Sequence, residues 1–314
     1  MTEQERTGSV RGNRVGAVVV TYNSSADIHE CLASLVAAGV DDILVLDNGS
    51  KRDEVTATSS VCSLHSQVEF HASPANMGFG AGVNQAVRLL PPCEFLWIIN
   101  PDTVADKGSV AALKSVLLDG KYDIVSPQIS TGEAGDPTIW FDGGSLDLVS
   151  LRTQHHGIGN VVQDPSGENI DCTFLTGCAL FMRFETWKAL GGFSERFFLY
   201  WEDAELSWRA TQQGMSLGVT REARIFHSVG GSGDRSGKSP VYFYYMQRNR
   251  LLFANKLHIG HKVFTGAGLL ETLRLTMRPL RQKTKPVEKF LFGIRGLIAG
   301  VNAIVIASKR DIKT

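Results

Sequence analysis

The chain has 314 residues, of which 43% are hydrophobic and 20% charged, as in an ordinary globular protein with a sizeable core. Lys and Arg balance Asp and Glu at 32 each, and this net charge of zero argues against a general nucleic-acid binder. The charge is uneven, however, because the stretch from residue 248 to the end carries 14 Lys and Arg against three Asp and Glu. A basic end on an acidic body indicates that the two parts meet different partners.

The cysteines and the first residues bear on the cellular compartment. Five cysteines with no CxxC pair favour reduced thiols in a cytoplasmic protein. The first 14 residues, MTEQERTGSVRGNR, are polar and contain no apolar segment. We therefore expect no signal peptide and a disordered leader over residues 1–14.

The first hundred residues alternate strands with helices. Apolar, β-branched runs predict buried strands over 15–21, 43–46, 68–71 and 95–99, and helical periodicity predicts helices over 26–38 and 83–89. This alternation predicts an α/β fold with an open, mostly parallel sheet, in which ligands bind beyond the carboxyl ends of the strands. Polar residues follow these strands at 21–23, 47–48, 76–82 and 100–102, and we expect them to converge on one site.

After about residue 125 the pattern changes to short strands and turns, and helices return over 186–189, 204–213 and 242–256. We place one domain over 15–240 and a basic, apolar helical extension over 241–314. Within the extension, residues 290–308 are almost continuously apolar but contain Arg295 and several glycines. We favour a helix lying on a membrane surface, where the flanking basic residues suit anionic lipid, over a helix that spans the bilayer. The alternatives are packing on the protein's own core or on a second copy in a homodimer.

Two acidic residues that end predicted strands are candidates for ligand binding. Asp102 can present a hard oxygen to Mg²⁺ or Mn²⁺, or else cap a helix over 106–118. Asp47 can accept a hydrogen bond from the imide N–H of a uracil or thymine ring, with Thr21 and Asn23 on the ribose side. The alternative for Asp47 is an Asx turn that satisfies its own backbone.

The loop over 76–82 is rich in Gly and Asn and precedes a helix, so its backbone N–H groups can approach an anion. It matches neither a Walker loop nor GxGxxG. Asn84, one turn into the helix, is a further candidate for contact with the ligand. Near the carboxyl end of the chain, Arg248 and Arg250 can clamp a diphosphate, or else lie on a solvated helix face.

The segment FLYWEDAELSWRA, residues 198–210, places acids directly behind four large apolar residues. The start of a helix favours carboxylates, which explains the acids without any function. An acceptor sugar, however, stacks on aromatic rings while a carboxylate takes its hydroxyl proton. Tyr200 and Trp201 can provide the stacking surface, Glu202 can support it, and apolar neighbours strengthen a carboxylate as a base.

Nine segments in order resemble the inverting glycosyltransferases of family 2, especially their rhamnosyltransferase-like branch, over residues 15–253. They are VVVTYNS, LDNGS, NMGFGAGVNQA, WIINPD, FDGG, FLTGCALFMR, GGFSERFFLYWEDAELSWR, FHSVGGS and YYMQRNR. The resemblance implies a GT-A fold, a nucleotide-sugar donor, a divalent metal (Mg²⁺ or Mn²⁺) and a single carboxylate base. One departure is that Asn100 stands where similar enzymes carry the first Asp of an Asp-x-Asp motif.

The resemblance also implies roles for individual residues. It assigns the base to Asp203 and the metal to Asp102 and His227. The Gly-rich loop over 230–234, which follows His227, would then be a mobile lid over the donor. The donor-binding set comprises Thr21, Tyr22, Asn23, Asp47, Asn48, Asn76, Gly78, Gly80, Asn84, Asn100 and Arg248, and the acceptor-binding set comprises Tyr200, Trp201 and Glu202. One base on one face implies a single displacement with inversion.

By this resemblance the enzyme transfers L-rhamnose from dTDP-rhamnose to a hydroxyl group of a cell-envelope or polysaccharide acceptor, and the alternative donor is UDP-galactofuranose or another UDP-hexose. A polyprenyl-diphosphate-linked saccharide as acceptor would explain the basic, apolar extension and a place on the inner face of the cell membrane. A function of another class, a catalytically silent nucleotide-binding scaffold, rests on the departure at Asn100.

Overall fold

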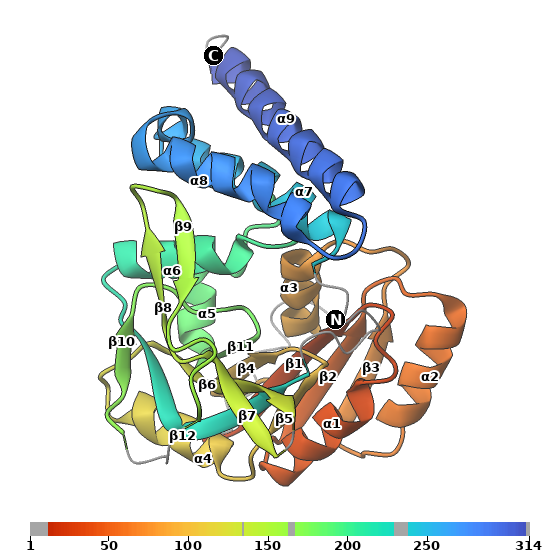
Figure 1. Cartoon of the computed structure of the whole chain (residues 1–314). Helices are drawn as coiled ribbons and strands as arrows, with labels where there is room; N and C mark the ends of the chain where they lie inside the picture. The colour runs from red at the N-terminus through yellow and green to blue at the C-terminus, as the bar shows by residue number, and fades with distance from the viewer. Residues whose placement is uncertain (1–11, 134, 163–166, 229–237, 312–314) are drawn as a thin grey trace.

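The computed structural model describes residues 12–133, 135–162, 167–228 and 238–311. Residues 1–11 of the leader predicted over 1–14, and the whole lid predicted over 230–234, lie outside these ranges. Sheet and helices form a layered body, with the carboxyl-terminal helices gathered at one end of it (Figure 1).

A mixed sheet forms the centre of the molecule, in the order β10-β12-β6-β11-β4-β1-β2-β3, with β5 paired to β12 and β7 paired to β6. Its strands are β1 (Val15–Thr21), β2 (Asp42–Asp47), β3 (Val68–Ala72), β4 (Phe95–Ile99), β5 (Thr103–Ala105), β6 (Ile124–Glu133), β7 (Asp136–Phe141), β10 (Ile170–Cys172), β11 (Ala179–Arg183) and β12 (Leu217–His227). The strands β8 (Gly144–Asp147) and β9 (Arg152–His155) form a separate antiparallel hairpin.

The first half of the sheet is parallel, as predicted. β1 lies between β2 and β4, and all its residues are buried because helices cover both faces of a parallel sheet. The register pairs Thr21 with Asp47, so polar residues at the ends of β1 and β2 lie side by side. Only the later strands depart from the prediction, since β11 runs antiparallel between β4 and β6.

The helices largely follow the predicted periodicity. They are α1 (Ile28–Ala37), α2 (Arg52–Cys62), α3 (Phe79–Leu89), α4 (Ser109–Leu118), α5 (Phe184–Leu190), α6 (Glu202–Gln212), α7 (Pro240–Lys256), α8 (Gly266–Met277) and α9 (Pro286–Asp311), with short 3₁₀ turns η2 (Gly260–Phe264) and η3 (Arg278–Arg281). Two differences matter for the site. α3 begins four residues earlier than predicted, and β5 stands between Asp102 and α4, whose N-cap is Gly108. The alternative in which Asp102 caps that helix is therefore wrong.

The carboxyl-terminal region begins inside the main core. From α7, Leu251 and Phe253 are buried in the same apolar cluster as the sheet. α9 packs closely along α7 because glycines lie at the contact. A side chain at Gly296 would collide with the carbonyl of Tyr244, and one at Gly300 with Leu251. Packing on the protein's own core, one of the alternatives for residues 290–308, is thus correct for one face of α9. No helix among the described residues is long and apolar enough to cross a membrane.

Candidate active site

The pairing of β5 with β12 brings Asp102 and His227 together. In its register His227 faces Thr103, and the backbone N–H of Ser228 donates to the carbonyl of Asp102 (2.9 Å). As a result, the Nε2 atom of His227 lies 3.2 Å from Oδ2 of Asp102. Asp102 Oδ1 and His227 Nδ1 are buried without a protein partner, although buried polar atoms normally have one. The sequence prediction that these two residues form one cluster is consistent with this geometry.

The electrostatics of this pair favour a positive charge. Burial would by itself lower the pKa of His227, but the neighbouring Cys178 and the hydrogen-bonded carboxylate of Asp102 raise it to about 10. The imidazole also meets the ring of Trp140 edge-on, with centroids 4.7 Å apart, which restricts its rotation. Asp102 thus lies where it stabilises either a proton or a metal ion at Nε2.

Asp203 lies at the start of α6 and is held by backbone N–H groups. Its Oδ2 accepts from Gly177 (3.1 Å) and its Oδ1 from Ala204 (2.8 Å). Desolvation nevertheless dominates and raises the pKa of this carboxyl group above its ordinary value. A raised pKa strengthens a carboxylate as a proton acceptor, provided that the pH is high enough to keep it ionised.

The turn at Gly177-Cys178 connects Asp203 to the metal-ligand candidates. Gly177 contacts Asp203, while the carbonyl of Cys178 accepts from the backbone N–H of Asn100 (2.9 Å). The electrostatic interaction of Cys178 with His227 places it beside that ring as well. Three segments that are far apart in the chain therefore meet at this turn. In the sequence this turn lies within FLTGCALFMR, and no role was predicted for it there.

Asp47 and Thr21, at the ends of β2 and β1, each have a buried polar atom without a partner in the protein. Asp47 is fully buried, and its Oδ1 accepts from the backbone N–H of Ser50 (2.9 Å), so it satisfies a nearby backbone group, three residues on, as one of its roles. Its Oδ2 and the hydroxyl group of Thr21 are buried without a partner. Because buried polar atoms normally have a partner, Oδ2 of Asp47 can accept a hydrogen bond from a ligand, for example from an imide N–H.

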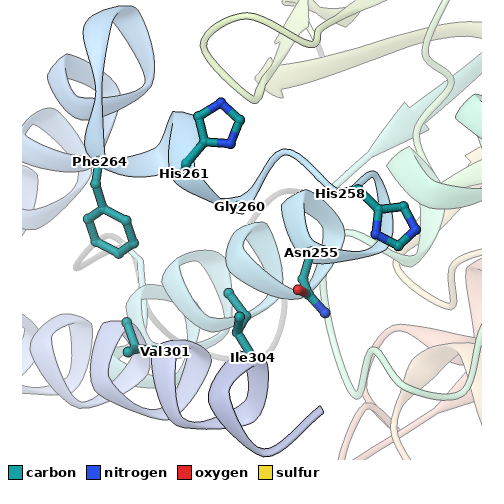
Figure 2. A pocket seen from close by; sticks show the side chains of 7 residues that line it. All are labelled: Asn255, His258, Gly260, His261, Phe264, Val301 and Ile304. Atoms are coloured by element: carbon teal, nitrogen blue, oxygen red, sulfur yellow. The ribbon is translucent and has the colours of Figure 1, made fainter. Parts of the chain in front are cut away.

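A pocket of about 420 Å³ lies away from these residues, between α7, η2 and α9 (Figure 2). Figure 2 shows the imidazoles of His258 and His261 at its rim, with Val301 and Ile304 on α9. None of the predicted donor, metal or acceptor residues lines it. We therefore place the candidate active site at the strand ends and not in this pocket.

Comparison with known proteins decides the family. The model of the family described as "Glycosyl transferase family 2" matches residues 17–189, which is more than half of the chain. The chain belongs to this family. It is a glycosyltransferase that acts on nucleotide sugars.

Two relatives extend over most of the chain. A low-salt glycan biosynthesis hexosyltransferase, Agl10 of Haloferax volcanii, is 24% identical over 295 residues, which cover 90% of each protein. The N-acetylglucosaminyl-diphospho-decaprenol L-rhamnosyltransferase of Mycobacterium tuberculosis is 25% identical over 274 residues, 77% of this chain and 84% of the relative.

Solved structures show the fold. GalNAc-T7 with UDP, GalNAc and Mn²⁺ has a TM-score of 0.61 at 14% identity; the match covers 83% of this chain and 54% of that one. The mannosyltransferase PcManGT of Pyrobaculum calidifontis, in complex with GDP-Man and Mn²⁺, has a TM-score of 0.53 at 13% identity and covers 95% and 80%. The predicted fold class is confirmed: a GT-A glycosyltransferase fold with a carboxyl-terminal helical region.

The residues of this glycosyltransferase fit a divalent cation. Two ligand atoms about 2.1 Å from a cation and at right angles to each other are about 3 Å apart. The 3.2 Å between Asp102 Oδ2 and His227 Nε2 is compatible with that arrangement. In the described part of the chain no group of three or more His, Cys, Asp or Glu could hold a metal ion. With only Asp102 and His227 as protein ligands, such a cation would need further ligands from outside the described residues.

Some residues predicted to bind the donor instead form hydrogen bonds with neighbouring loops of the protein. Asn84 donates to the carbonyl of Phe193 (2.9 Å) and to Glu195 (3.0 Å), and accepts from the N–H of Phe193 (2.9 Å). Asn48 donates to Asn76 and to the carbonyl of Gly78, and accepts from Met77. Because the amide groups of Asn48 and Asn84 are already engaged, these two asparagines hold loops of the site in place and are corrected from donor ligands. Only Oδ1 of Asn76 is engaged, by Asn48 and the N–H of Gly78, so its predicted contact with the donor stays a prediction.

The glycines of the loop have a steric role. Gly78 has a φ of +89°, and a side chain there would collide with the carbonyl of Phe198. Gly80 lies inside α3 against Phe193 and Glu202. Both glycines therefore allow the segment before α6 to approach α3 closely, and their predicted contact with the donor stays a prediction.

The acceptor platform is also different from the prediction. Trp201 is only 4% exposed and packs against Phe253, with ring centroids 5.4 Å apart, so it offers no face to a sugar. Glu202 is equally buried, and desolvation together with the adjacent Asp203 raises its pKa well above the ordinary value. Both were wrongly placed at the acceptor surface. Tyr200 remains partly exposed and meets Tyr242 edge-on.

Arg250 does not clamp a diphosphate. It is fully buried and donates to the carbonyls of Ser150 (2.7 Å), Leu151 (2.8 Å) and Gly268 (2.8 Å) and to Thr272 Oγ1 (2.6 Å). Burial lowers its pKa to about 10. Arg248 is partly exposed and donates to Asn249 (2.8 Å), and its predicted contact with the donor stays a prediction.

Asn249 is a residue of the site that the sequence analysis missed. Its Nδ2 donates to the carbonyls of both Leu199 (2.8 Å) and Tyr200 (2.9 Å). Tyr200 and Trp201 have φ values of +66° and +76°, a conformation that costs free energy for residues with side chains. Asn249 therefore stabilises the strained turn that delivers Asp203. Asn249 could have been found from its position within YYMQRNR, one of the segments that resemble the family. The prediction named only the arginines on either side of it, Arg248 and Arg250.

Replacing Asn249 by Ala should lower kcat by about 10- to 100-fold with little change in the KM for the donor, because the turn before Asp203 loses both donors. The unfolding free energy should fall by about 1–3 kcal/mol. Gln247→Ala is the matched control, since Gln247 is a buried amide on the same helix that donates to Thr276, away from the site. Steady-state kinetics and urea unfolding of both variants check this. Equal loss of kcat in the control would assign Asn249 a merely structural role.

Proposed function

We propose that this enzyme transfers an L-rhamnosyl group from dTDP-L-rhamnose to a hydroxyl group of a saccharide acceptor. The transfer inverts the configuration at the anomeric carbon of the sugar. The observation that carries the proposal is the meeting of Asp203, the Gly177-Cys178 turn and the Asp102–His227 pair. A single carboxylate base beside a cation site suits one in-line displacement. In support, one relative is named as an L-rhamnosyltransferase and another as a hexosyltransferase.

In this proposal Asp203 takes the proton of the acceptor hydroxyl group as that oxygen attacks the anomeric carbon. Backbone N–H groups hold the carboxylate in place, and burial together with Asp203 raises the pKa of Glu202, which disfavours a second negative charge beside the base. Asp47 and Thr21 bind the base and ribose of the nucleotide through their unpartnered atoms. Tyr22, which is half-exposed, and Asn23 and Asn100 border the same edge.

Asp102 and His227 would hold Mg²⁺ or Mn²⁺, which supplies positive charge to the leaving diphosphate. Because Asn100 replaces a carboxylate, the protein provides few ligands, and we expect cation binding to depend on bound donor. The acceptor we propose is a lipid-linked saccharide, like the N-acetylglucosaminyl-diphospho-decaprenol after which the mycobacterial relative is named, with the enzyme peripheral on the inner face of the cell membrane.

A donor screen tests the proposal. Purified enzyme is incubated with Mn²⁺ and dTDP-L-rhamnose, UDP-galactofuranose or UDP-glucose, and a lipid-linked saccharide, and released nucleoside diphosphate and the configuration of the product are measured. Release from the dTDP sugar alone, with inverted product, is expected. Release only from a UDP sugar would overturn the donor, and retention of configuration would overturn the mechanism.

Removal of the cation should abolish activity. EDTA is expected to stop transfer, and Mn²⁺ to restore it. His227→Ala should raise the Mn²⁺ concentration for half-maximal rate by about 10- to 100-fold, because it removes one of two protein ligands. His155→Ala is the control, since that imidazole also contacts Trp140 but is no proposed ligand. Mn²⁺ binding in the presence of donor is followed by electron paramagnetic resonance. Full transfer in EDTA would contradict the assignment.

A further inference from the structure

An uninterrupted apolar row lies on the outer face of α8. Leu270, Leu273 and Met277 are 68%, 53% and 52% exposed, and Leu280 on η3 continues the row. Their spacing of three, four and three residues keeps them on one side of a helix. The opposite face, which includes Glu271, Thr272 and Leu275, is buried. A soluble surface normally scatters large apolar side chains, so such a row indicates a partner.

Charge decides which kind of partner fits. From Lys262 to Arg295 the chain carries eight Lys and Arg against only two Asp and Glu. Exposed Arg274 borders the row directly, and Arg278 and Arg281 flank its end on η3. In a homodimer across this face, two basic borders would oppose each other. A membrane surface with anionic headgroups meets the same border with opposite charge while its acyl region receives the leucines.

The face has a fixed place relative to the candidate active site. Arg250 of α7 donates to Gly268 and Thr272 of α8, which holds the two helices together. At the other end of α8, Arg278 donates to the hydroxyl group of Tyr242 (3.3 Å), whose ring meets that of Tyr200. A short series of contacts thus leads from the apolar row to the turn before Asp203.

We propose that the outer face of α8 and η3 docks the enzyme on a membrane surface rich in anionic lipid. This rests on the proposed function in one respect, the lipid-linked acceptor, which docking would bring within reach of Tyr200 and Asp203. It changes the location that the sequence favoured. The outer face of α9 carries Val287, Leu291 and Ile298, but Arg295 and Asn302 interrupt it, and its inner face packs on α7.

Co-sedimentation with vesicles tests the proposal. The full chain is mixed with phosphatidylcholine vesicles with and without about 30% phosphatidylglycerol, and binding is expected only with the anionic lipid. Leu270→Ser combined with Leu273→Ser should weaken that binding by about tenfold or more, because two large apolar side chains no longer enter the bilayer. The matched control is Leu64→Ser combined with Leu118→Ser, which changes equally exposed leucines elsewhere and should leave binding unchanged. The competing location is tested by Leu291→Ser combined with Ile298→Ser.

The outcomes separate docking from catalysis. Each variant should unfold at the wild-type temperature and release nucleoside diphosphate at the wild-type rate with a short-chain, water-soluble acceptor analogue. No binding of wild type to anionic vesicles, or a loss confined to the α9 variant, would overturn the proposal. A wild-type dimer that the α8 variant converts to monomers, with vesicle binding unchanged, would show that a second copy occupies the face. Failure with every donor and acceptor would overturn the proposed function while leaving docking measurable.

Discussion

Asp203→Asn should lower kcat by about 10²- to 10⁴-fold, the range that a general base contributes. An amide cannot take the proton of the acceptor hydroxyl group, yet it has nearly the shape of the carboxyl group and can keep one hydrogen bond with the backbone. The KM for the donor should therefore change little. Single-turnover and steady-state kinetics with saturating donor measure the effect. A variant with kcat within about threefold of wild type would eliminate Asp203 as the base.

Glu202→Gln is the control for this prediction. Burial and the neighbouring Asp203 raise the pKa of Glu202, which favours the uncharged form of its carboxyl group, and an uncharged amide has nearly the same shape. We expect kcat within about threefold of wild type. Both enzymes should gain activity as the pH rises through the raised pKa of Asp203, because only the ionised form accepts a proton. Because desolvation raises the pKa of Glu202 and of Asp203, both carboxyl groups contribute to the stability of the fold at low pH. This contribution is lost as the pH rises through the raised pKa values.

Arg250→Met should lower the unfolding free energy by about 3–5 kcal/mol, the largest effect on stability that we expect. The substitution leaves three carbonyls and Thr272 Oγ1 without their donor in a buried place. Arg250 also joins α7, α8 and the turn between β8 and β9, so its loss should expose α8 to proteolysis. Urea unfolding and limited proteolysis are the measurements.

The control for Arg250 is Arg281→Met, an exposed arginine on η3 whose loss should change stability by no more than about 0.5 kcal/mol. The contrasting hypothesis, that Arg250 clamps the donor diphosphate, predicts the opposite pattern. A variant of normal stability with a greatly raised KM for the donor would favour that hypothesis and contradict the buried role.

The parallel part of the fold was predictable because its strands are continuous apolar runs. β4 was predicted with its observed bounds, and β1 likewise, since buried strands of a parallel sheet carry no polar residue within them. β5 and the antiparallel place of β11 were not predicted. Three residues, Thr103–Ala105, are too few for a periodic pattern, and strand direction depends on partners far away in the chain.

The structure bears on the site predictions differently for each type of residue. Asp102 and His227 were named from their segments, and the structure brings their side chains into contact through β5 and β12. Asparagines were the main source of error. The amide group of an asparagine can bind a ligand or form hydrogen bonds with a neighbouring segment, and only its partners in the structure distinguish the two roles. Asn84, for example, donates to the carbonyl of Phe193 and to Glu195.

By itself the amino-acid sequence determined the class of fold, the strand ends as the location of the site, and Asp203 as the candidate base. The class of fold and the strand ends follow from periodicity, whereas the choice of Asp203 follows from the resemblance of its segment to the glycosyltransferases of family 2. Tertiary structure alone decided that Trp201 and Arg250 are buried, that Asn249 supports the turn before Asp203, and that α8 exposes its leucines. Burial and hydrogen-bond partners arise from contacts between segments that are distant in the chain. The sequence of one helix or strand does not determine which of its faces such contacts will cover.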